Sequence, residues 1–293
     1  MRIIYAAALL WFLASGSAEA QMTAAERLAE AKDLLKKEGV PCEVMAATEL
    51  ALRNLQALLK EHPDDPEVPF AEYLSGVCLI RLGRYDEAVK PLEDAARSPV
   101  DSRGRENILW HLAFAYFRSL NYVRAKEAYE TFLQEFPESR NADEAKKVLA
   151  PLRMVGTRAN LFKATDISGQ PLDLKALMGR PLLLHFWATW CPPCRQELPN
   201  IKKAFDEFHG KGLQFVGVSL DTDIAVLTDY IKANGVSWPH YCDGQKWNSP
   251  LAKVYNVNSV PMLFLIDRAG VIRYADIRSE TLFRAIGILL EEK

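Results

Sequence analysis

The sequence of residues 182–194 is LLLHFWATWCPPC, and this stretch decides the fold of the second half of the chain. Leu182–Trp187 is a short apolar run of the kind that forms a buried strand. The residues after Cys194 follow a helical pattern, which places both thiols at a turn from a strand into a helix. Two thiols with this spacing can close a small disulfide, and the N–H groups at a helix start favour a thiolate. The stretch therefore predicts thiol–disulfide exchange, in which one sulfur attacks and a second resolves the mixed disulfide.

Short apolar runs and helical patterns alternate around this stretch from residue 157 to residue 293, which predicts an α/β domain. Strands are expected at 161–165, 171–174, 182–187, 213–220, 238–241, 262–267 and 271–277. Helices are expected at 173–177, 193–209, 224–234, 250–255 and 279–291, with Ser279 as a candidate N-cap of the last one.

Helical periodicity dominates the first half, and residues 21–152 are predicted to form a separate all-α domain. Residues 81–88 (RLGRYDEA) are similar to residues 118–125 (RSLNYVRA), and each stretch is typical of a turn between two helices. This internal repeat resembles the tetratricopeptide repeat (TPR), whose period is about 34 residues. An earlier degenerate unit is expected at 23–63 and a capping helix at 141–152. Such a domain either offers a groove to a protein partner or serves as a scaffold or oligomerisation domain.

The N-terminus has the pattern of a secretory signal peptide. A basic residue precedes the apolar stretch 3–14, and residues 18–20 (AEA) form an A-x-A cleavage pattern. The apolar stretch is shorter than the ~20 residues that span a bilayer. We expect residues 1–20 to be removed after Ala20 and the mature chain to be exported, to the periplasm in a Gram-negative host. The alternative is an uncleaved segment that anchors the chain to the membrane.

The composition is that of an ordinary globular protein, with 49% hydrophobic residues, 25% charged residues and a formal net charge of -2. This charge balance gives no support for nucleic-acid binding. No cysteine and histidine spacing fits a structural zinc site. Exchange through a dithiol needs neither a metal nor an organic cofactor, so none is expected. Outside the CPPC motif, Cys42 and Cys78 either bridge or pack as small apolar residues, and Cys242 is expected to be inert.

The order of the elements, with the CPPC motif after the first core strand and Val260-Pro261 before the last hairpin, resembles the thioredoxin fold. More narrowly, residues 186–199 (FWATWCPPCRQELP) are similar to the TlpA/ResA/CcmG group of exported thiol-disulfide oxidoreductases. The similarity covers residues 157–293. The expected fold class is therefore two-domain, with an all-α TPR-like helical repeat domain followed by an α/β thioredoxin-like fold.

The resemblance implies a role for each residue of the motif. Cys191 would be the attacking thiolate and the more exposed sulfur, and Cys194 would be the buried resolving thiol. Pro192 and Pro193 would restrict the dithiol loop and tune its redox potential, a role compatible with their suitability for a helix start.

Three further residues would form the substrate site. Pro261 would be the family's cis-proline that faces the disulfide, although an X-Pro bond is cis in only about 5–6% of cases in folded proteins. Val260 would offer its backbone groups to an extended substrate strand, in the manner of strand addition. Trp190 would form part of an apolar rim beside Cys191.

Two polar residues have competing interpretations. Glu197 is either a solvated helix carboxylate or, as the resemblance implies, an acidic residue near the dithiol that tunes and shuttles protons. His185 occupies the position, six residues before the first cysteine, at which thioredoxins have a buried aspartate. It is expected to be a core histidine that hydrogen-bonds to the backbone, and the alternative is a neutral proton acceptor.

The resemblance implies an enzyme that reduces disulfides of exported protein substrates, such as apocytochrome c or copper-site proteins of respiratory oxidases. Electrons would come from a membrane thiol reductase, because the dithiol must be regenerated in an oxidising compartment. The sequence leaves open whether the protein acts as reductant or oxidant. One alternative is a peroxiredoxin-like peroxidase. Another is an interaction module in which the helical repeats bind a protein partner and the redox domain senses it.

Overall fold

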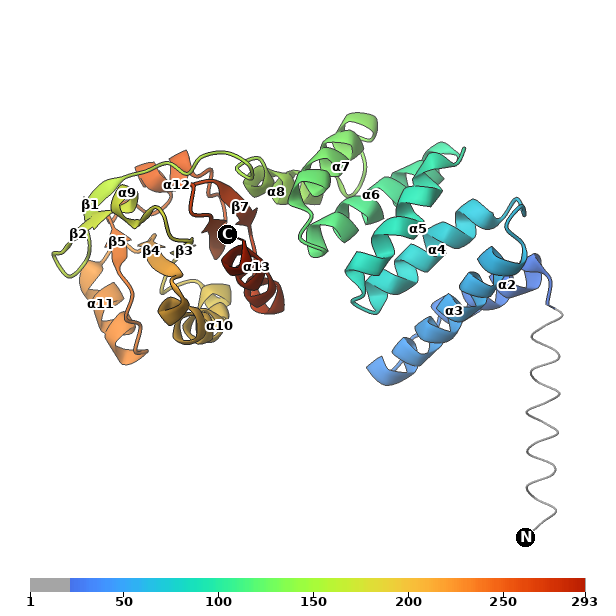
Figure 1. Cartoon of the computed structure of the whole chain (residues 1–293), viewed down its shortest axis with the longest axis horizontal. Helices are drawn as coiled ribbons and strands as arrows, with labels where there is room; N and C mark the ends of the chain where they lie inside the picture. The colour runs from blue at the N-terminus through green and yellow to red at the C-terminus, as the bar shows by residue number, and fades with distance from the viewer. Residues whose placement is uncertain (1–21, 293) are drawn as a thin grey trace, which may run out of the picture. The chain divides into compact units, whose positions relative to one another are not determined.

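The computed structural model describes residues 22–292 (Figure 1). The expected signal peptide at 1–20, with its cleavage site, lies outside the described residues. No helix within the described part of the chain is long and apolar enough to cross a membrane. The chain forms two compact units, of which the first ends at Ser119 and the second begins at Leu120.

The first unit consists of consecutive helices joined by short turns, as the repeat pattern predicts. Its helices are α2 (Ala24–Leu35), α3 (Pro41–Glu61), α4 (Val68–Arg81), α5 (Tyr85–Arg97) and α6 (Ser102–Arg118). Helices α4 and α5 approach closely where Gly76 faces Leu92, because a Cβ on Gly76 would lie only 2.4 Å from Cγ of Leu92. A small residue at this position is what allows the two helices of the pair to pack against each other.

The cysteines of the first unit do not form a disulfide. Cys42 is exposed near the start of α3, whereas Cys78 is fully buried in α4. Burial raises the pKa of the Cys78 thiol to about 12. Cys78 therefore packs as a small apolar residue, which was one of the two alternatives expected from the sequence.

The second unit begins with two helices, α7 (Tyr122–Glu135) and α8 (Ala142–Leu152), the latter at the expected position of the capping helix. Both contact the part of the unit that follows them. The ring centroids of Tyr122 and Tyr274 are 5.6 Å apart, and the amide of Asn256 donates to the carbonyl of Ala150 at 3.5 Å. The division between compact units thus precedes the expected domain boundary at 152–157, which stays a prediction.

A five-stranded sheet in the order β5-β4-β3-β6-β7 forms the core of the second unit. Its strands are β3 (Leu182–Trp187), β4 (Gln214–Ser219), β5 (His240–Cys242), β6 (Met262–Ile266) and β7 (Ile272–Ala275). Strand β3 runs parallel to β4 and antiparallel to β6, and all six of its residues are buried. This mixed sheet confirms the predicted α/β thioredoxin-like fold class. A separate antiparallel pair is formed by β1 (Lys163–Thr165) and β2 (Pro171–Asp173).

The helices of the sheet domain are α9 (Leu174–Leu177), α10 (Pro192–Phe208), α11 (Ile224–Ala233), α12 (Pro250–Val254) and α13 (Ser279–Glu291), with short 3-10 turns at His209–Lys211 and Lys246–Asn248. The boundaries of strands and helices differ from the expected ones by at most two residues. One detail is wrong: the N-cap of α13 is Arg278, and Ser279 is already helical. The hydroxyl of Ser279, which was expected to cap the helix, donates to Glu197 of α10 instead.

Strands β3, β4 and β5 are mutually parallel, so their carboxyl ends meet at one edge of the sheet. Helices α10 and α11 follow β3 and β4 at this edge. Ligand and catalytic sites of open α/β sheets form at the carboxyl ends of the strands. The CPPC motif lies there because it directly follows β3.

Candidate active site

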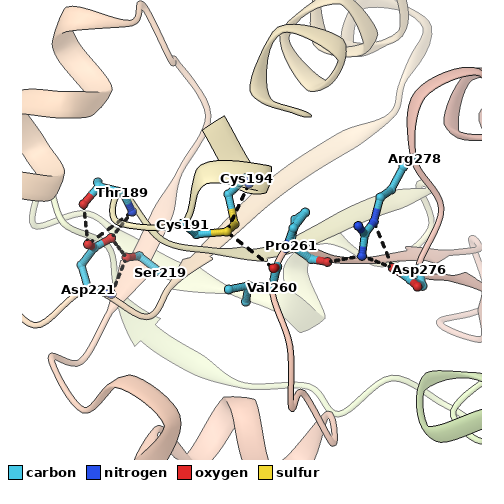
Figure 2. The surroundings of a disulfide bond; sticks show 9 residues. All are labelled: Thr189, Cys191, Cys194, Ser219, Asp221, Val260, Pro261, Asp276 and Arg278. Atoms are coloured by element: carbon cyan, nitrogen blue, oxygen red, sulfur yellow. Dashed lines mark hydrogen bonds and ion pairs between the residues drawn. A yellow bond between two sulfur atoms is a disulfide. The ribbon is translucent and has the colours of Figure 1, made fainter. Parts of the chain in front are cut away.

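The CPPC motif starts α10 directly after the central strand (Figure 2). Cys191 and Cys194 form a disulfide, with their Cα atoms 5.2 Å apart. Cys191 is the N-cap of α10, and its Sγ accepts a hydrogen bond from the backbone N–H of Cys194 at 3.1 Å. Pro192 and Pro193 occupy the first two helical positions, where a missing N–H leaves no intrahelical bond unmade. The motif thus places Sγ of Cys191 at the positive end of the helix dipole.

The two sulfurs differ slightly in exposure. Cys194 is fully buried, whereas Cys191 is 4% exposed, which matches the expected order. Next to Cys191, the indole of Trp190 is 45% exposed and contacts that of Trp247, which is 42% exposed, with ring centroids 6.2 Å apart. An apolar surface of two tryptophans therefore borders the dithiol, and Trp247 is a member that the sequence patterns did not identify.

The loop before β6 faces the disulfide (Figure 2). The peptide bond between Val260 and Pro261 is cis, as the family resemblance implies. Sγ of Cys191 lies 3.5 Å from the carbonyl oxygen of Val260. The backbone N–H of Val260 has no hydrogen-bond partner within the described part of the chain. An extended segment of a bound polypeptide could pair with this backbone directly beside the sulfur.

A buried carboxylate holds the turn between β3 and α10. The side chain of Asp221 accepts hydrogen bonds from the N–H of Thr189 at 3.0 Å and from its hydroxyl at 2.6 Å. Oγ of Ser219 donates to the same carboxylate at 2.6 Å (Figure 2). The turn that presents Cys191 is thus fastened to the end of the neighbouring parallel strand. Asp221 was not among the expected site residues, although an acidic residue directly after a buried strand is a usable signal.

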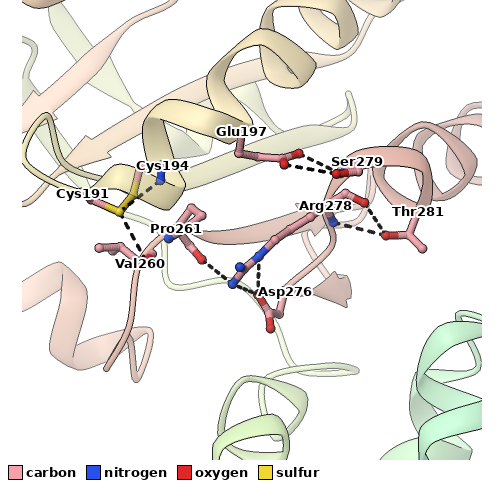
Figure 3. Close-up of polar contacts among 9 residues, drawn as sticks. All are labelled: Cys191, Cys194, Glu197, Val260, Pro261, Asp276, Arg278, Ser279 and Thr281. Carbon is pink, nitrogen blue, oxygen red and sulfur yellow. Dashed lines mark hydrogen bonds and ion pairs between the residues drawn. A yellow bond between two sulfur atoms is a disulfide. The ribbon is translucent and has the colours of Figure 1, made fainter. Parts of the chain in front are cut away.

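Glu197 is buried on α10, but its carboxylate points toward α13 rather than toward the sulfurs (Figure 3). It accepts hydrogen bonds from the backbone N–H of Ser279 at 2.7 Å and from its hydroxyl at 3.3 Å. The side-chain amide of Asn200 donates to it at 3.2 Å. In the oxidised state described here, Glu197 therefore connects the redox helix to the start of α13.

Arg278 lies between β7 and the cis-proline loop (Figure 3). Its Nη2 donates to the carbonyl oxygen of Pro261 at 3.0 Å and to Oδ1 of Asp276 at 2.7 Å. Burial raises the pKa of Asp276, and the neighbouring Arg278 guanidinium acts in the opposite direction. Neither residue was expected at the site, because the bonds that bring them there join separate loops.

His185 lies in the middle of β3 and is buried, with its ring stacked on Trp187 at a centroid distance of 5.8 Å. Neither ring nitrogen has a hydrogen-bond partner within residues 22–292, so the expected bond to the backbone is wrong. The reason is that the backbone of β3 pairs with β4 on one side and β6 on the other. Burial lowers the pKa of His185 to about 3, which keeps the imidazole neutral.

Cys242 lies on β5, where its Sγ is 3.2 Å from the carbonyl oxygen of Asp221. Burial raises the pKa of this thiol. A protonated, half-buried thiol is a poor nucleophile, in agreement with its expected inertness. No group of three or more potential metal-ligating side chains is present in the described residues.

Comparison with known proteins places this geometry in a family. The AhpC/TSA family matches residues 155–275, and a tetratricopeptide repeat matches residues 108–139. Thiol-disulfide oxidoreductase ResA of Bacillus thuringiensis (strain Al Hakam) is 36% identical over 118 residues, which cover 40% of this chain and 65% of that protein. Sporulation thiol-disulfide oxidoreductase A of Bacillus subtilis is 31% identical over 115 residues, covering 38% of this chain and 67% of that protein. A solved thiol-disulfide oxidoreductase from Bacteroides fragilis is 31% identical, with 45% of this chain and 99% of that chain covered and a TM-score of 0.43.

The chain belongs to the thioredoxin-fold thiol-disulfide oxidoreductases that include ResA, and it carries a tetratricopeptide repeat ahead of the redox domain. This result confirms the family resemblance drawn from residues 186–199. The chain spans about 65% of the length of the ResA relatives that it matches.

Proposed function

We propose that this protein is an exported thiol-disulfide oxidoreductase that reduces disulfides of other exported proteins through Cys191 and Cys194. One observation carries the proposal. The Cys191–Cys194 disulfide lies at the N-terminus of α10, with the Cys191 sulfur 3.5 Å from the backbone of the cis-proline loop. After reduction, this arrangement would provide a thiolate favoured by the helix start, a resolving thiol and a backbone that can hold a substrate.

The reaction transfers two electrons and begins from the reduced protein. The Cys191 thiolate attacks one sulfur of a substrate disulfide, forms a mixed disulfide and releases the other substrate sulfur as a thiolate, which takes up a proton. The Cys194 thiol then loses its proton and attacks Sγ of Cys191, releasing the second substrate thiol. The product is the Cys191–Cys194 disulfide described above, so the structure corresponds to the oxidised end of the cycle.

The remaining site residues act around this exchange. The N–H of Cys194, which donates to Cys191 Sγ, would stabilise the attacking thiolate together with the helix dipole. Pro192 and Pro193 would keep the loop short, and Val260 would pair with the substrate backbone next to Pro261 while Trp190 covers apolar substrate side chains. Glu197, as a proton carrier, would have to leave Ser279 in the reduced state.

The proposed location and partners rest on the resemblance to exported members of the family. Export would rest on the segment 1–20, and a membrane thiol reductase would return electrons to the dithiol. Substrates would be disulfide-containing proteins, among them apocytochromes c and copper-site proteins. The helical repeats would recruit one class of partner to the redox domain, since repeat domains present extended binding surfaces.

The experiment is capture of mixed disulfides in the exporting host with Cys194→Ala, which leaves Cys191 able to attack but unable to be released. We expect specific exported proteins to be trapped by Cys194→Ala, and none by the matched Cys191→Ser/Cys194→Ala control. Capture without residues 21–119 tests helices α2 to α6: an unchanged set of partners at equal yield would exclude recruitment by these helices.

Purified protein tests the direction of the reaction. We expect the reduced chain to precipitate insulin by reduction and not to consume peroxide faster than its Cys191→Ser variant. A reduction potential near the strongly oxidising value of about -120 mV would overturn the assignment as a reductase. The measurement is sensitive, since a difference of about 30 mV corresponds to roughly 1.4 kcal/mol for this two-electron couple.

A further inference from the structure

The segment between β7 and α13 is bonded to both halves of the redox site (Figure 3). Arg278 donates to the carbonyl of Pro261 in the cis-proline loop, and the N–H of Ser279 donates to Glu197 of the redox helix. Asp276 and Ser279 both have a left-handed backbone, with φ values of 54° and 49°. Residues other than glycine adopt this conformation at an energetic cost and keep it only where surrounding contacts hold it. The hydrogen bonds of Asp276, Arg278 and Ser279 are contacts of that kind.

Asp276 determines how the Arg278 guanidinium is oriented. Nε and Nη2 of Arg278 both donate to Oδ1 of Asp276, at 3.1 Å and 2.7 Å. A guanidinium is planar, and its donors have fixed directions relative to one another. With two nitrogens held by Asp276, the direction of the Nη2 bond to Pro261, 3.0 Å long, is fixed as well. A lysine ammonium has no such planar fork and cannot reproduce this arrangement.

The carbonyl that Arg278 holds belongs to the turn that carries Val260. Val260 directs its carbonyl oxygen at Sγ of Cys191, 3.5 Å away, and its N–H is unpaired within the described part of the chain. Pro261 leads directly into β6, which pairs with the central strand. The sheet thus fixes the turn on its C-terminal side, and Arg278 holds the Pro261–Met262 peptide group, which follows the cis bond after Val260. That bond is therefore a side-chain contact that restrains the turn directly after Val260.

We propose that Arg278 is a positioning residue of the redox site, which holds the Pro261 carbonyl so that the Val260 backbone is preoriented for an extended polypeptide substrate. The inference rests on the proposed function, because it assigns the binding of protein disulfides to that same site. Preorientation lowers the ordering cost of binding and therefore acts on protein substrates. A small disulfide that forms no strand with Val260 gains nothing from it.

The test compares two substrates of the full chain. Insulin is a protein with disulfide bonds, whereas dithiodipyridine is a small uncharged disulfide. Loss of the Arg278 charge therefore has no direct electrostatic effect on the reaction with dithiodipyridine. We expect Arg278→Met to raise KM for insulin about tenfold, which corresponds to about 1.4 kcal/mol. We expect kcat for insulin and the rate with dithiodipyridine to change less than twofold.

Arg273→Met is the matched control. Arg273 also forms an exposed ion pair, with Glu292 at 2.6 Å, and its side chain is 36% exposed against 41% for Arg278. It has no bond to the cis-proline loop, so its loss should leave both substrates unaffected. Arg278→Lys keeps the charge but not the planar fork, and we expect it to recover only part of the KM change.

Three results would overturn the inference. An equal loss with insulin and dithiodipyridine would assign Arg278 a general structural role. Full recovery by Arg278→Lys would assign the effect to charge, and an unchanged KM in Arg278→Met would exclude any role in binding. These results differ from failure of the proposed function itself, in which the unsubstituted chain reduces neither substrate.

Discussion

Two buried histidines, His185 on β3 and His240 on β5, are the register partners of Gly217 on the strand between them. His185 pairs with Gly217 across β3 and β4, and Gly217 pairs with His240 across β4 and β5. The ring of His240 covers Gly217 so closely that a Cβ there would lie 2.2 Å from Cδ2. Burial lowers the pKa of His240 to about 4 and that of His185 to about 3. Both imidazoles are therefore neutral over the whole range in which the enzyme is expected to work.

Folding stability should consequently depend on pH through His185. An unfolded histidine titrates near pH 6.5, whereas folded His185 stays neutral down to about pH 3. Below about pH 6.5 the unfolded state binds a proton on His185 that the folded state does not bind. The contribution of His185 to stability is therefore fully present above about pH 6.5 and is lost as pH falls from there toward 3. Between about pH 7 and pH 5, the free energy of unfolding should fall in both proteins. We expect the fall to be about 2 kcal/mol smaller in His185→Leu than in the unsubstituted chain. Urea unfolding followed by tryptophan fluorescence measures the difference, and equal losses in the two proteins would contradict it.

At the scale of elements, Glu197 provides a polar contact between α10 and α13. Its carboxylate supplies an acceptor for the N–H of Ser279, one of the first-turn donors that have no partner inside the helix. The ring centroids of Phe208 and Phe283 are 6.0 Å apart, so apolar contact accompanies the polar one. The helix that carries the dithiol is thus joined to the helix that closes the domain.

Substitution of Glu197 separates this structural role from proton transfer. We expect Glu197→Ala to lower the free energy of unfolding by about 2 kcal/mol, because the N–H of Ser279 loses a charged acceptor. Glu197→Gln keeps an acceptor oxygen and should cost about half as much. Glu207→Ala, an exposed position on the same helix, is the control and should be neutral.

The rate of exchange then tests the second role of Glu197. If the glutamine variant is stable but exchanges disulfides several times more slowly, Glu197 also carries protons. If Glu197→Gln matches the unsubstituted rate across pH, the carboxylate serves only to connect the two helices.

At the scale of the whole molecule, the redox domain includes more of the chain than its sheet. The segment after α8 pairs with β7, since the N–H of Gly156 donates to Ile272 and the N–H of Ile272 donates to Thr157, at 2.8 Å and 2.9 Å. Tyr122 of α7 contacts Tyr274 of β7. Helix α7 and the segment after α8 therefore support β7, the edge strand of the sheet.

Two fragments test this division. We expect residues 120–293 to fold and to reduce dithiodipyridine at the rate of the full chain. Residues 157–293 should keep the dithiol chemistry but unfold at a temperature lower by roughly 5 °C, because α7 and α8 no longer cover β7. Equal unfolding midpoints, measured by circular dichroism, would show that these helices do not stabilise the redox domain.

Much of the fold was predictable because its signals are local. The apolar run Leu182–Trp187 and the turn at Arg268-Ala269-Gly270 identify strands and a hairpin within a few residues of chain. Cys191 and Cys194 lie within a stretch of four residues. The hydrogen-bonded surroundings of these cysteines were not predictable, since Thr189 and Asp221 are 32 residues apart and Glu197 and Ser279 are 82 residues apart.

The sequence by itself determined the kind of fold and the position of the redox pair, because a CPPC motif between an apolar run and a helical pattern is recognisable without any distant residue. Only the tertiary structure decided that Arg278 reaches the carbonyl of Pro261 and that Glu197 points away from the sulfurs to Ser279. The physical reason is that hydrogen bonds between separate loops depend on how strands and helices pack. Such bonds leave no periodic pattern in the sequence, so they cannot be inferred from it.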